Sequence, residues 1–498
     1  MISARRTTSC PSRAVAGIQS PPMIDALALE IAGGVHIALP PDPRMLSTCV
    51  FLEQEEWFED EAPFVRRIAE PGGRMLDIGA SFASYALSYA KAAGPESRVW
   101  AIEPTPEVCE YIRQSARLND FGNLTVLETA VGAEAARGWL SSAATSEIHR
   151  LNLEGGSVEV DVAALDSLDA AHGFGAVDFV KIDVEGHEAA VIAGGREFFT
   201  RESPLVMIEV RAEAAFDFTA VDALEKLDYR TFRLIPQFGA LAPFSRSGAD
   251  PYLLNVFACK ADRAARLAER DLLSETPDAP PAMAEPAALR TQLHGIAAMA
   301  AVAAHLDGVM ERIPRDDPSL LLLLHDLASR DGSLPLATRV ASLSRAASLA
   351  RQIATAPASP FRVMSAARIL LGWGDRDAAV NAIQKILPAV MNRTECAIDV
   401  PFLPPLAAYD AWGAATDPGG WVSASVIEAA ALWSSLGIYW SEPFNQPGAE
   451  LLARYGRATP RLERRRQLRR IRESRQAGVQ SHPLLQTKTP ENLNPGVW

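Results

Sequence analysis

The first half of the chain alternates short apolar runs with longer amphipathic stretches. Five apolar runs fall at residues 75–78, 99–104, 124–127, 177–184 and 204–210, and a helical pattern at 85–93 follows the first of them. Strands that alternate with helical segments at this spacing predict a doubly wound, mainly parallel α/β sheet. Three further runs, at 156–162, 229–234 and 253–259, predict a hairpin insertion and an antiparallel sheet edge.

The second half has a different pattern, in which Ala and Leu recur at helical spacing. The periodicity is broken at Pro314, at Pro335 and at residues 357–360. Helices with short breaks of this kind predict an additional all-α C-terminal domain. Residues 361–387 resemble one helix–turn–helix unit of a tetratricopeptide repeat, although we find no second copy at the period of that repeat.

These patterns divide the chain into five parts. The expected parts are an N-terminal arm, partly disordered, at 1–44; an α/β domain at 45–262; a linker at 263–286; an α-helical domain, possibly tetratricopeptide-like, at 287–455; and a basic tail, partly disordered, at 456–498. Within the α/β domain, residues 53–67 are acidic and amphipathic, which predicts a helical region broken near Pro63.

The turn after the first predicted strand carries the first candidate chemistry. Gly79 follows that strand, Asp77 lies just before it, and Glu103 ends the second strand. Glycine permits a tight reversal and the close approach of a ligand to the backbone. Ligands of open α/β sheets bind at the carboxyl ends of the strands. A carboxylate at Glu103 could accept hydrogen bonds from both hydroxyls of a ribose, so this edge is expected to hold an adenosine.

The glycine content of the turn indicates which adenosine cofactor is bound. Pyrophosphate binding requires the pattern G-x-G-x-x-G, whereas residues 79–84 contain one glycine and lie beside Asp77. A carboxylate repels a pyrophosphate but favours the cationic amino-acid end of S-adenosylmethionine (SAM). We therefore assign Asp77 and Gly79 to the methionine end of SAM and Glu103 to the ribose. Ala130, which follows the third strand, is assigned to the adenine edge, and core packing explains it equally well.

The chemistry is expected after the fourth strand, at Asp183, Glu185 and His187. Because the methyl group of SAM already carries its leaving group, the protein mainly supplies alignment and a base within hydrogen-bond reach. Two nearby carboxylates, Asp183 and Glu185, should raise one another's pKa, and His187 titrates near neutral pH. Alternatively, Glu185 and His187 form an acidic cap and a solvated first turn of a helix. Glu209, at the end of the fifth strand, is a weaker candidate.

Four segments resemble the FkbM family of SAM-dependent methyltransferases over about residues 45–260. They read DIGASFASYAL, AIEPTPEVCEYIRQSARLN, VDFVKIDVEGHE and PLVMIEV. The resemblance implies a Rossmann-like class I methyltransferase fold and methyl transfer, usually to a hydroxyl on a sugar, glycan or polyketide, and it favours Asp183 or Glu185 as the catalytic base. The family's first motif reads DIGAN-x-G. Here Ser81 stands for the Asn and keeps a short polar contact with the cofactor, while Ala83 replaces the second Gly.

Composition and net charge limit the kinds of ligand and the compartment that we expect for this protein. A net charge of −13 argues against a nucleic acid. Five scattered cysteines favour a reducing cytoplasm. The chain has no Cys or His spacing typical of zinc, so we expect no metal site, with magnesium left open. No apolar stretch reaches the length of a transmembrane helix.

The sequence therefore predicts a cytoplasmic SAM-dependent O-methyltransferase that acts on a sugar, a glycan or another secondary metabolite. The helical domain would bind the acceptor or a protein partner. Two alternatives stay open. One is a catalytically weak or degenerate SAM-binding scaffold, consistent with Ser81 and Ala83, whose helical domain binds a protein partner. The other is N-methylation of an amine.

Overall fold

The protein, described from a computed structural model, forms two compact units. The structure describes residues 24–41, 45–140, 151–152, 156, 158–212, 215–275, 279–392, 396–412, 418–434, 452 and 459–473. The first unit comprises Met1–Phe232, Leu254–Leu267 and Leu468–Trp498; the second comprises Arg233–Leu253 and Ala268–Gln467. The second unit thus takes residues 233–253 from inside the range expected to form the α/β domain.

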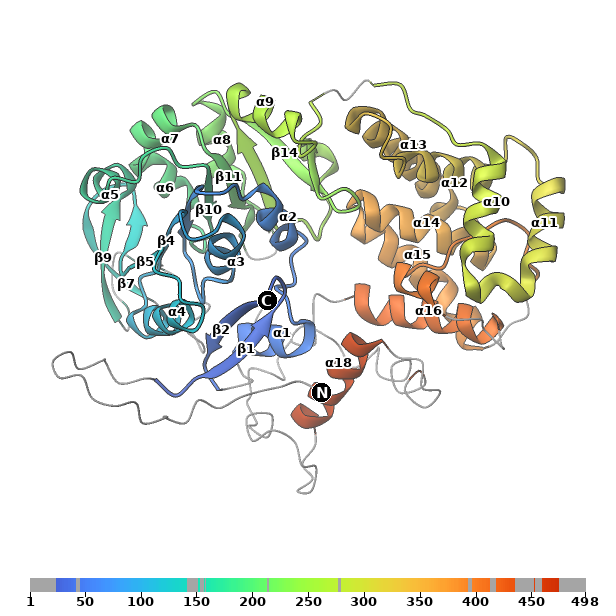
Figure 1. Ribbon diagram of the computed structural model, residues 1–498, viewed down its shortest axis with the longest axis horizontal. Helices are drawn as coiled ribbons and strands as arrows, with labels where there is room; N and C mark the ends of the chain where they lie inside the picture. Colours follow the sequence, from blue (N-terminus) through green and yellow to red (C-terminus); the bar gives the residue numbers. More distant parts are fainter. Residues whose placement is uncertain are drawn as a thin grey trace. The chain divides into compact units, whose positions relative to one another are not determined.

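A mainly parallel sheet forms the centre of the first unit (Figure 1). The strands of this sheet are β3 (Arg74–Ile78), β4 (Arg98–Ile102), β5 (Leu124–Leu127), β10 (Phe179–Ile182), β11 (Leu205–Glu209), β14 (Arg230–Ile235), β15 (Ala240–Pro243) and β16 (Asn255–Cys259). Strand β15 and the end of β14 fall within residues 233–253, which are counted with the second unit. The order of the strands in the sheet is β15-β14-β16-β11-β10-β3-β4-β5. Strands β5, β4, β3, β10 and β11 are parallel, while β16 is antiparallel to β11 and β14. The predicted doubly wound sheet with an antiparallel edge is confirmed.

The helices of the first unit follow the predicted alternation with strands. They are α1 (Leu46–Gln54), α2 (Glu61–Ile68), α3 (Ser84–Ala93), α4 (Pro106–Leu118), α5 (Leu165–His172), α6 (Glu188–Gly194), α7 (Arg196–Glu202), α8 (Thr219–Glu225) and α9 (Ala261–Glu269). The break expected near Pro63 is wrong, because it lies between α1 and α2, at residues 55–60. Pro63 is the third residue of α2, where a missing N–H breaks no helical hydrogen bond.

Smaller sheets complete the first unit. They are β1 (Leu27–Ile31) with β2 (Val35–Leu39); β6 (Ala130–Gly132), β9 (Val158–Ala164), β7 (Ala136–Leu140) and β8 (Leu151–Asn152), in that order; and β12 (Arg211–Ala212) with β13 (Ala215–Phe216). The β1–β2 hairpin lies within the stretch expected to be an arm. Its apolar residues alternate and are buried, and the Ala38 amide donates to Ser115 Oγ in α4 at 2.8 Å.

The second unit is largely helical, as the sequence predicts. Its helices are α10 (Pro286–Gly295), η3 (Ala297–Val302), α11 (Ala303–Arg312), α12 (Pro318–Ser329), α13 (Leu336–Thr355), α14 (Pro360–Trp373), α15 (Arg376–Met391), η4 (Ala407–Ala411), α16 (Pro418–Trp433) and most of α18 (Pro460–Glu473). Helices α12 to α16 pack in chain order, each on the next. The predicted helical hairpin is α14 and α15, joined at Gly374 in the left-handed region (φ 86°).

Three aromatic residues between positions 402 and 421 pack inside this unit. Phe402, Tyr409 and Trp421 are at most 1% exposed, and the Tyr409 hydroxyl donates to buried Glu428 at 2.8 Å. These three side chains are therefore part of the core of the helical unit. Within the described residues, no single helix is both long and apolar enough to cross a membrane; one pair of helices, bent by 110°, meets that test only when taken together.

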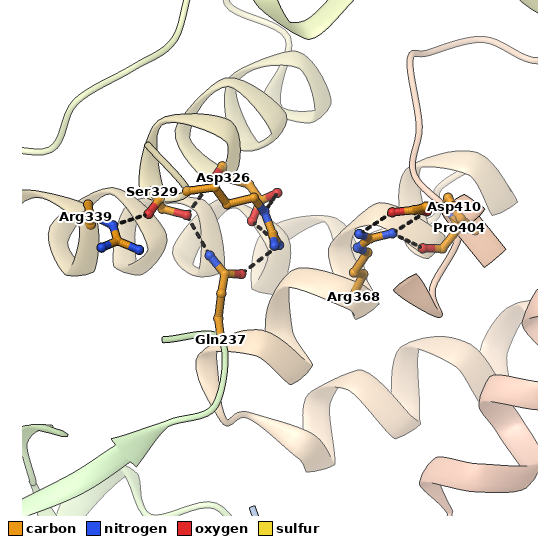
Figure 2. A network of polar contacts seen from close by, with 8 residues as sticks. Gln237, Asp326, Ser329, Arg339, Arg368, Pro404 and Asp410 are labelled. Atoms are coloured by element: carbon orange, nitrogen blue, oxygen red, sulfur yellow. Dashed lines mark hydrogen bonds and ion pairs between the residues drawn. The ribbon is translucent and has the colours of Figure 1, made fainter. Parts of the chain in front are cut away.

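The 233–253 segment is fastened to the helices of the second unit by polar contacts. Figure 2 shows the Gln237 side chain pointing toward α12. Its amide nitrogen donates to Ser329 Oγ at 2.7 Å, and its oxygen accepts from Arg330 at 2.8 Å. Farther along the segment, the Asp250 carboxylate accepts the Asp377 amide at the start of α15 at 2.9 Å. The helical unit therefore includes this segment of strand and loop as a structural part.

Candidate active site at the carboxyl edge of the sheet

The strand order reverses at β3, which lies between β4 and β10. In open α/β sheets such a reversal marks the place where ligands bind, at the carboxyl ends of the strands. Register pairs Ile78 with Ile182, and Ile182 with Ile208. The residues that follow these three, Gly79, Asp183 and Glu209, therefore lie in a row along one edge.

Close packing requires a glycine at position 79. Gly79 has a φ of 76°, and a Cβ placed on it would lie 1.7 Å from the Asp183 carbonyl oxygen. The amides of Gly79 and Ala80 both donate to the Ile102 carbonyl at the end of β4, at 3.0 and 3.1 Å. Three neighbouring strands thus meet at this turn, and any side chain there would force β10 away from β3.

The turn continues through two residues with left-handed backbones that are not glycine. Ser81 has a φ of 48° and Ala83 a φ of 59°. An L-residue in this region is strained by roughly 1–2 kcal/mol. The strain at Ala83 explains physically why glycine suits this position, and Ala83 then caps α3, accepting the Leu87 amide at 2.9 Å.

Glu103 is held beside this turn. Its carboxylate is 8% exposed and accepts the Ser81 amide at 3.0 Å and the Thr105 amide at 2.9 Å. Burial raises the pKa of Glu103, and these hydrogen bonds oppose the shift. Glu103 therefore joins the turn after β3 to the end of β4 as a fixed acceptor.

Asp77 lies below the turn, 1% exposed. Its Oδ2 accepts the Ala86 amide in the first turn of α3 at 3.1 Å, and its Oδ1 is 4.0 Å from the ammonium of Lys181. No described residue donates a hydrogen bond to Oδ1. Burial, partly offset by Lys181, raises the pKa of Asp77 to about 7.

Lys181 connects Asp77 with the row at the edge. The two residues are register partners on β10 and β3, and the Lys181 ammonium lies 2.8 Å from Asp183 Oδ2. Burial alone would lower the pKa of Lys181, but the negative charges of Asp183, Asp77 and Glu59 raise it above the ordinary value. Asp183, with its side chain 32% exposed, is the member of this group that reaches the surface of the edge.

Asp183 and Glu209 follow register partners on adjacent strands, and their pKa values shift in opposite directions. Burial opposes ionisation of Asp183, but the charge of Lys181 outweighs it and lowers the pKa of Asp183. Burial, together with the charges of Asp183 and Glu185, raises the pKa of Glu209 to about 11. At neutral pH Asp183 is therefore a carboxylate and Glu209 a carboxylic acid.

Glu59, in the connection between α1 and α2, also belongs to the group of charged residues around Lys181. Its carboxylate accepts the Tyr85 hydroxyl at 2.5 Å and the Asn255 amide at 3.0 Å. Tyr85 lies on α3, with the Lys181 ammonium 5.4 Å from the centre of its ring. Asn255, which is buried, is the register partner of Glu209 on β16.

Comparisons with known proteins assign part of the chain to a family. Residues 77–234 match the family described as the methyltransferase FkbM domain. The chain carries an FkbM methyltransferase domain. Methyl transfer from SAM is therefore the activity that residues 77–234 are expected to carry.

Several solved structures are similar at low identity. The FkbM methyltransferase of Methylobacillus flagellatus KT is 18% identical over 37% of this chain and 43% of that chain, with a TM-score of 0.26. A SAM-dependent O-methyltransferase of Thermotoga maritima is 12% identical over 40% and 64%, with a TM-score of 0.25. Fibrillarin of Aeropyrum pernix, with natively bound SAM, is 15% identical over 47% and 93%, with a TM-score of 0.26. The chain spans less than half of the first of these, and no curated protein matches it.

The residues present in the FkbM domain fit SAM. Glu103 accepts the backbone amides of Ser81 and Thr105, and a carboxylate has further lone pairs that could accept from a ribose hydroxyl. Gly79 exposes backbone at the reversal of strand order. Asp77 is too deeply buried for an open surface role, so its negative charge would act on the methionine end through the turn. These cofactor contacts, and the one expected of Ser81, remain predictions.

The remaining predicted residues of the FkbM domain have structural contacts. Glu185 (φ 55°) and His187 flank Gly186 and are partly buried. It is Glu188 that shapes this turn, since its buried carboxylate accepts the amides of Val184 and Gly186 at 3.0 and 3.1 Å. Ala130 begins β6 and packs with an apolar cluster between the strands of the small sheet, so its contact with adenine is also still a prediction.

One electrostatic expectation is corrected. Asp183 and Glu185 were expected to raise one another's pKa, but the group with the strongly raised pKa is Glu209. The reason is the buried ammonium of Lys181, which holds the charge on Asp183. Within the described part of the chain no group of His, Cys, Asp and Glu has the arrangement of a metal site.

Sequence reasoning missed Lys181, Glu59 and Asn255. Lys181 could have been found from the alternation in the segment KID, because residues two apart on a strand share a face. Glu59 and Asn255 lie outside the matched range 77–234, and only the fold brings them to the edge.

Proposed function

We propose that the enzyme methylates a hydroxyl group on a sugar, a glycan or a related secondary metabolite. The observation that supports this most is the ionised carboxylate of Asp183, partly exposed and adjacent to Gly79 at the end of β10. A carboxylate accepts hydrogen bonds only, so it selects an acceptor that brings a donor, as a hydroxyl does.

The reaction needs little from the protein beyond alignment and a proton acceptor. When bound, SAM supplies a methyl group whose bond to sulfur breaks as the bond to the acceptor oxygen forms, leaving a neutral thioether. Asp183 orients the acceptor hydroxyl and takes its proton, which then passes to water. Lys181 keeps Asp183 ionised before this step, and a base that is present in the correct state and geometry is effective.

The charge at the edge favours a neutral acceptor over an anionic one. Asp183, Glu185 and Glu103 contribute carboxyl groups here, while the ammonium of Lys181 is buried and already paired with Asp183. Negative potential repels phosphates and carboxylates. We therefore favour an uncharged hydroxyl compound over a sugar phosphate.

Methylation of an amine is the second candidate, and the charge of the site disfavours it. A negative site stabilises the ammonium form of an amine, and that form has no lone pair to attack with. Asp183, whose pKa is lowered, is a poor base for removing an ammonium proton before the attack. A hydroxyl can lose its proton while the new bond forms.

We also propose that the enzyme works in the cytoplasm and that its helical unit binds the acceptor or a protein partner. The described cysteines are free thiols, three buried and one, Cys396, exposed, which is compatible with a reducing compartment. The acidic net charge of −13 supports an acceptor other than nucleic acid.

Mass spectrometry of glycans and small metabolites, with and without the gene, tests the proposed acceptor. The proposal predicts a mass increment of one methyl group that needs the gene and lies on a hydroxyl oxygen. The purified enzyme should then methylate a neutral sugar carrying that hydroxyl, and should fail with its phosphate ester. Methyl groups found only on nitrogen would replace this proposal with the amine reaction.

A further inference from the structure

Glu59 lies outside the matched range 77–234, but hydrogen bonds hold its side chain at the carboxyl edge from two directions. Its Oε2 accepts the Tyr85 hydroxyl at 2.5 Å and the Asn255 side-chain amide at 3.0 Å. Tyr85 is in the first turn of α3, which follows β3, and Asn255 begins β16. Because β10 and β11 lie between β3 and β16, Glu59 bridges the edge across the end of β10, which Asp183 follows.

The contacts of Glu59 place it near the proposed base. The ring of Tyr85, whose hydroxyl Glu59 accepts, has its centre 5.4 Å from the Lys181 ammonium, and that ammonium lies 2.8 Å from Asp183 Oδ2. From the other side, Asn255 is on β16, two strands from β10, which is about 10 Å at the usual strand spacing. The carboxyl groups of Glu59 and Asp183 can therefore reach different hydroxyls of one acceptor molecule.

Glu59 keeps the capacity to accept a further hydrogen bond. Its side chain is partly buried, not enclosed, and the bonds from Tyr85 and Asn255 both end on Oε2. Each oxygen of a carboxylate has two acceptor positions, so Oε1 can receive a donor from a ligand. Because the two donors already hold the side chain in place, a ligand that binds to it would not have to order it first.

The two residues before Glu59 are aromatic. Trp57 and Phe58 are partly buried, with ring centroids 4.7 Å apart, and Trp57 also contacts Phe51 in α1 at 5.6 Å. Ligand pockets combine aromatic side chains with a small number of well-placed polar groups. The connection between α1 and α2 supplies both kinds of group within three consecutive residues.

We propose that Glu59 is a specificity-determining residue of the acceptor site, whose Oε1 accepts a hydrogen bond from a second hydroxyl of the acceptor while Asp183 holds the hydroxyl that receives the methyl group. The inference rests on the proposed function, in that the acceptor is a neutral hydroxyl compound bound at Asp183. It adds that the acceptor is a polyol such as a sugar, and not a compound with one hydroxyl. Glu59 takes no part in the proton transfer.

Glu59→Gln isolates this contact, because glutamine keeps an oxygen for Tyr85 and Asn255 and places an NH2 group where Oε1 lies. The assay uses the full chain with SAM and a panel of neutral methyl glycosides, each paired with its monodeoxy analogues. Wild-type protein should lose about tenfold in kcat/KM, mainly through KM, with the analogue that lacks the second hydroxyl. Glu59→Gln should lose about tenfold with the parent glycoside and little more with that analogue, because the two changes remove one contact.

Glu55→Gln is the matched control, since it removes the same charge from an exposed side chain of the same connection; its kcat/KM and SAM affinity should equal those of wild type. The proposal is overturned if Glu59→Gln distinguishes parent and analogue as wild type does, if it lowers kcat by one factor for every glycoside and analogue, as a merely structural role would, or if it weakens SAM binding. Wild-type protein that binds SAM but methylates no neutral glycoside would instead overturn the proposed function.

Discussion

The contact between Gly79 and Asp183 ties the cofactor turn to the strand that carries the acceptor-facing carboxylate. Replacing Gly79 with Ala should break this contact, because the new Cβ would lie 1.7 Å from the Asp183 carbonyl oxygen and 2.8 Å from its carbon. Gly94 supplies a matched control. Its φ of 79° is almost the same as the 76° of Gly79, and no described atom lies within 4 Å of the Cβ that alanine would add.

The two substitutions separate backbone strain from the steric clash. Gly94 has φ 79° and ψ 179°, a backbone conformation that costs alanine about 1–3 kcal/mol, and the stiffer unfolded chain returns about 0.4–1 kcal/mol. Gly94→Ala should therefore lower the free energy of unfolding by about 1–2 kcal/mol. Gly79→Ala adds a clash with the backbone of a central strand. This clash should lower the free energy of unfolding by at least a further ~3 kcal/mol, because it is more severe than the insertion of extra methylene groups into a packed core.

Thermal unfolding and SAM titration of both variants measure these effects. Gly79→Ala should unfold well below Gly94→Ala and bind SAM at least about tenfold more weakly, a difference of about 1.4 kcal/mol in binding free energy. Gly94→Ala should bind SAM like wild type. Equal stability and equal SAM affinity of the two variants would show that the close contact between β3 and β10 does not exist.

Four other changes have defined outcomes. Ala83→Gly should relieve left-handed strain and raise the free energy of unfolding by up to about 1 kcal/mol, seen in urea denaturation; a loss of stability would contradict the φ of 59°. The pKa of Asp77 is raised to about 7 in the folded protein, so its contribution to stability is complete below the ordinary pKa of 3.8 and is lost as the pH rises to about 7. Asp77→Asn should remove this loss, which amounts to up to about 1 kcal/mol per pH unit between about pH 5 and about pH 7. Parallel curves of unfolding free energy against pH for the two proteins would count against this prediction. Asp183→Ala should abolish methyl transfer while circular dichroism stays unchanged, and undiminished turnover would refute its role. Deleting residues 268–498 should give aggregated protein, because the partners of Gln237 and the rest of the 233–253 segment are removed; a monodisperse, SAM-binding product would show that the segment is independent.

Much of the fold could be predicted because the signals are local. The apolar runs, the single glycine and the breaks at proline identify the strands, the turn and the helices, and these elements occur within a few residues of where they were expected. The β1–β2 hairpin was missed because its alternation is short and lies in a polar terminal region, next to a stretch with little hydrophobic character.

The candidate site could be predicted only in part. Asp77, Glu103 and Asp183 were found because they stand at strand ends, where sequence position determines location. Lys181 and Glu209 were missed or underrated because their importance depends on cross-strand register, which pairs residues far apart in sequence. The pKa values of Asp183 and Glu209 shift in opposite directions because a buried ammonium, Lys181, lies beside Asp183 while Glu209 is itself buried, and burial is set by the whole fold.

The grouping of residues 233–253 with the helical unit could not be predicted either. Sequence composition changes near residue 260, which suggested a domain boundary there. The contacts of Gln237 and Asp250, however, are made to helical residues that lie 92 and 127 positions away in the sequence. Long-range polar contacts of this kind leave no periodic pattern in the chain.

Isothermal titration of the full chain with SAM, beside Glu103→Ala, examines the cofactor site without any knowledge of the acceptor. We predict one SAM per wild-type chain with micromolar affinity, and a loss of at least about tenfold in the variant, because Glu103 supplies the ribose acceptors at the point where the strand order reverses. Absence of binding by the wild-type chain, or equal affinity of the two proteins, would contradict the assignment of the carboxyl edge as the SAM site.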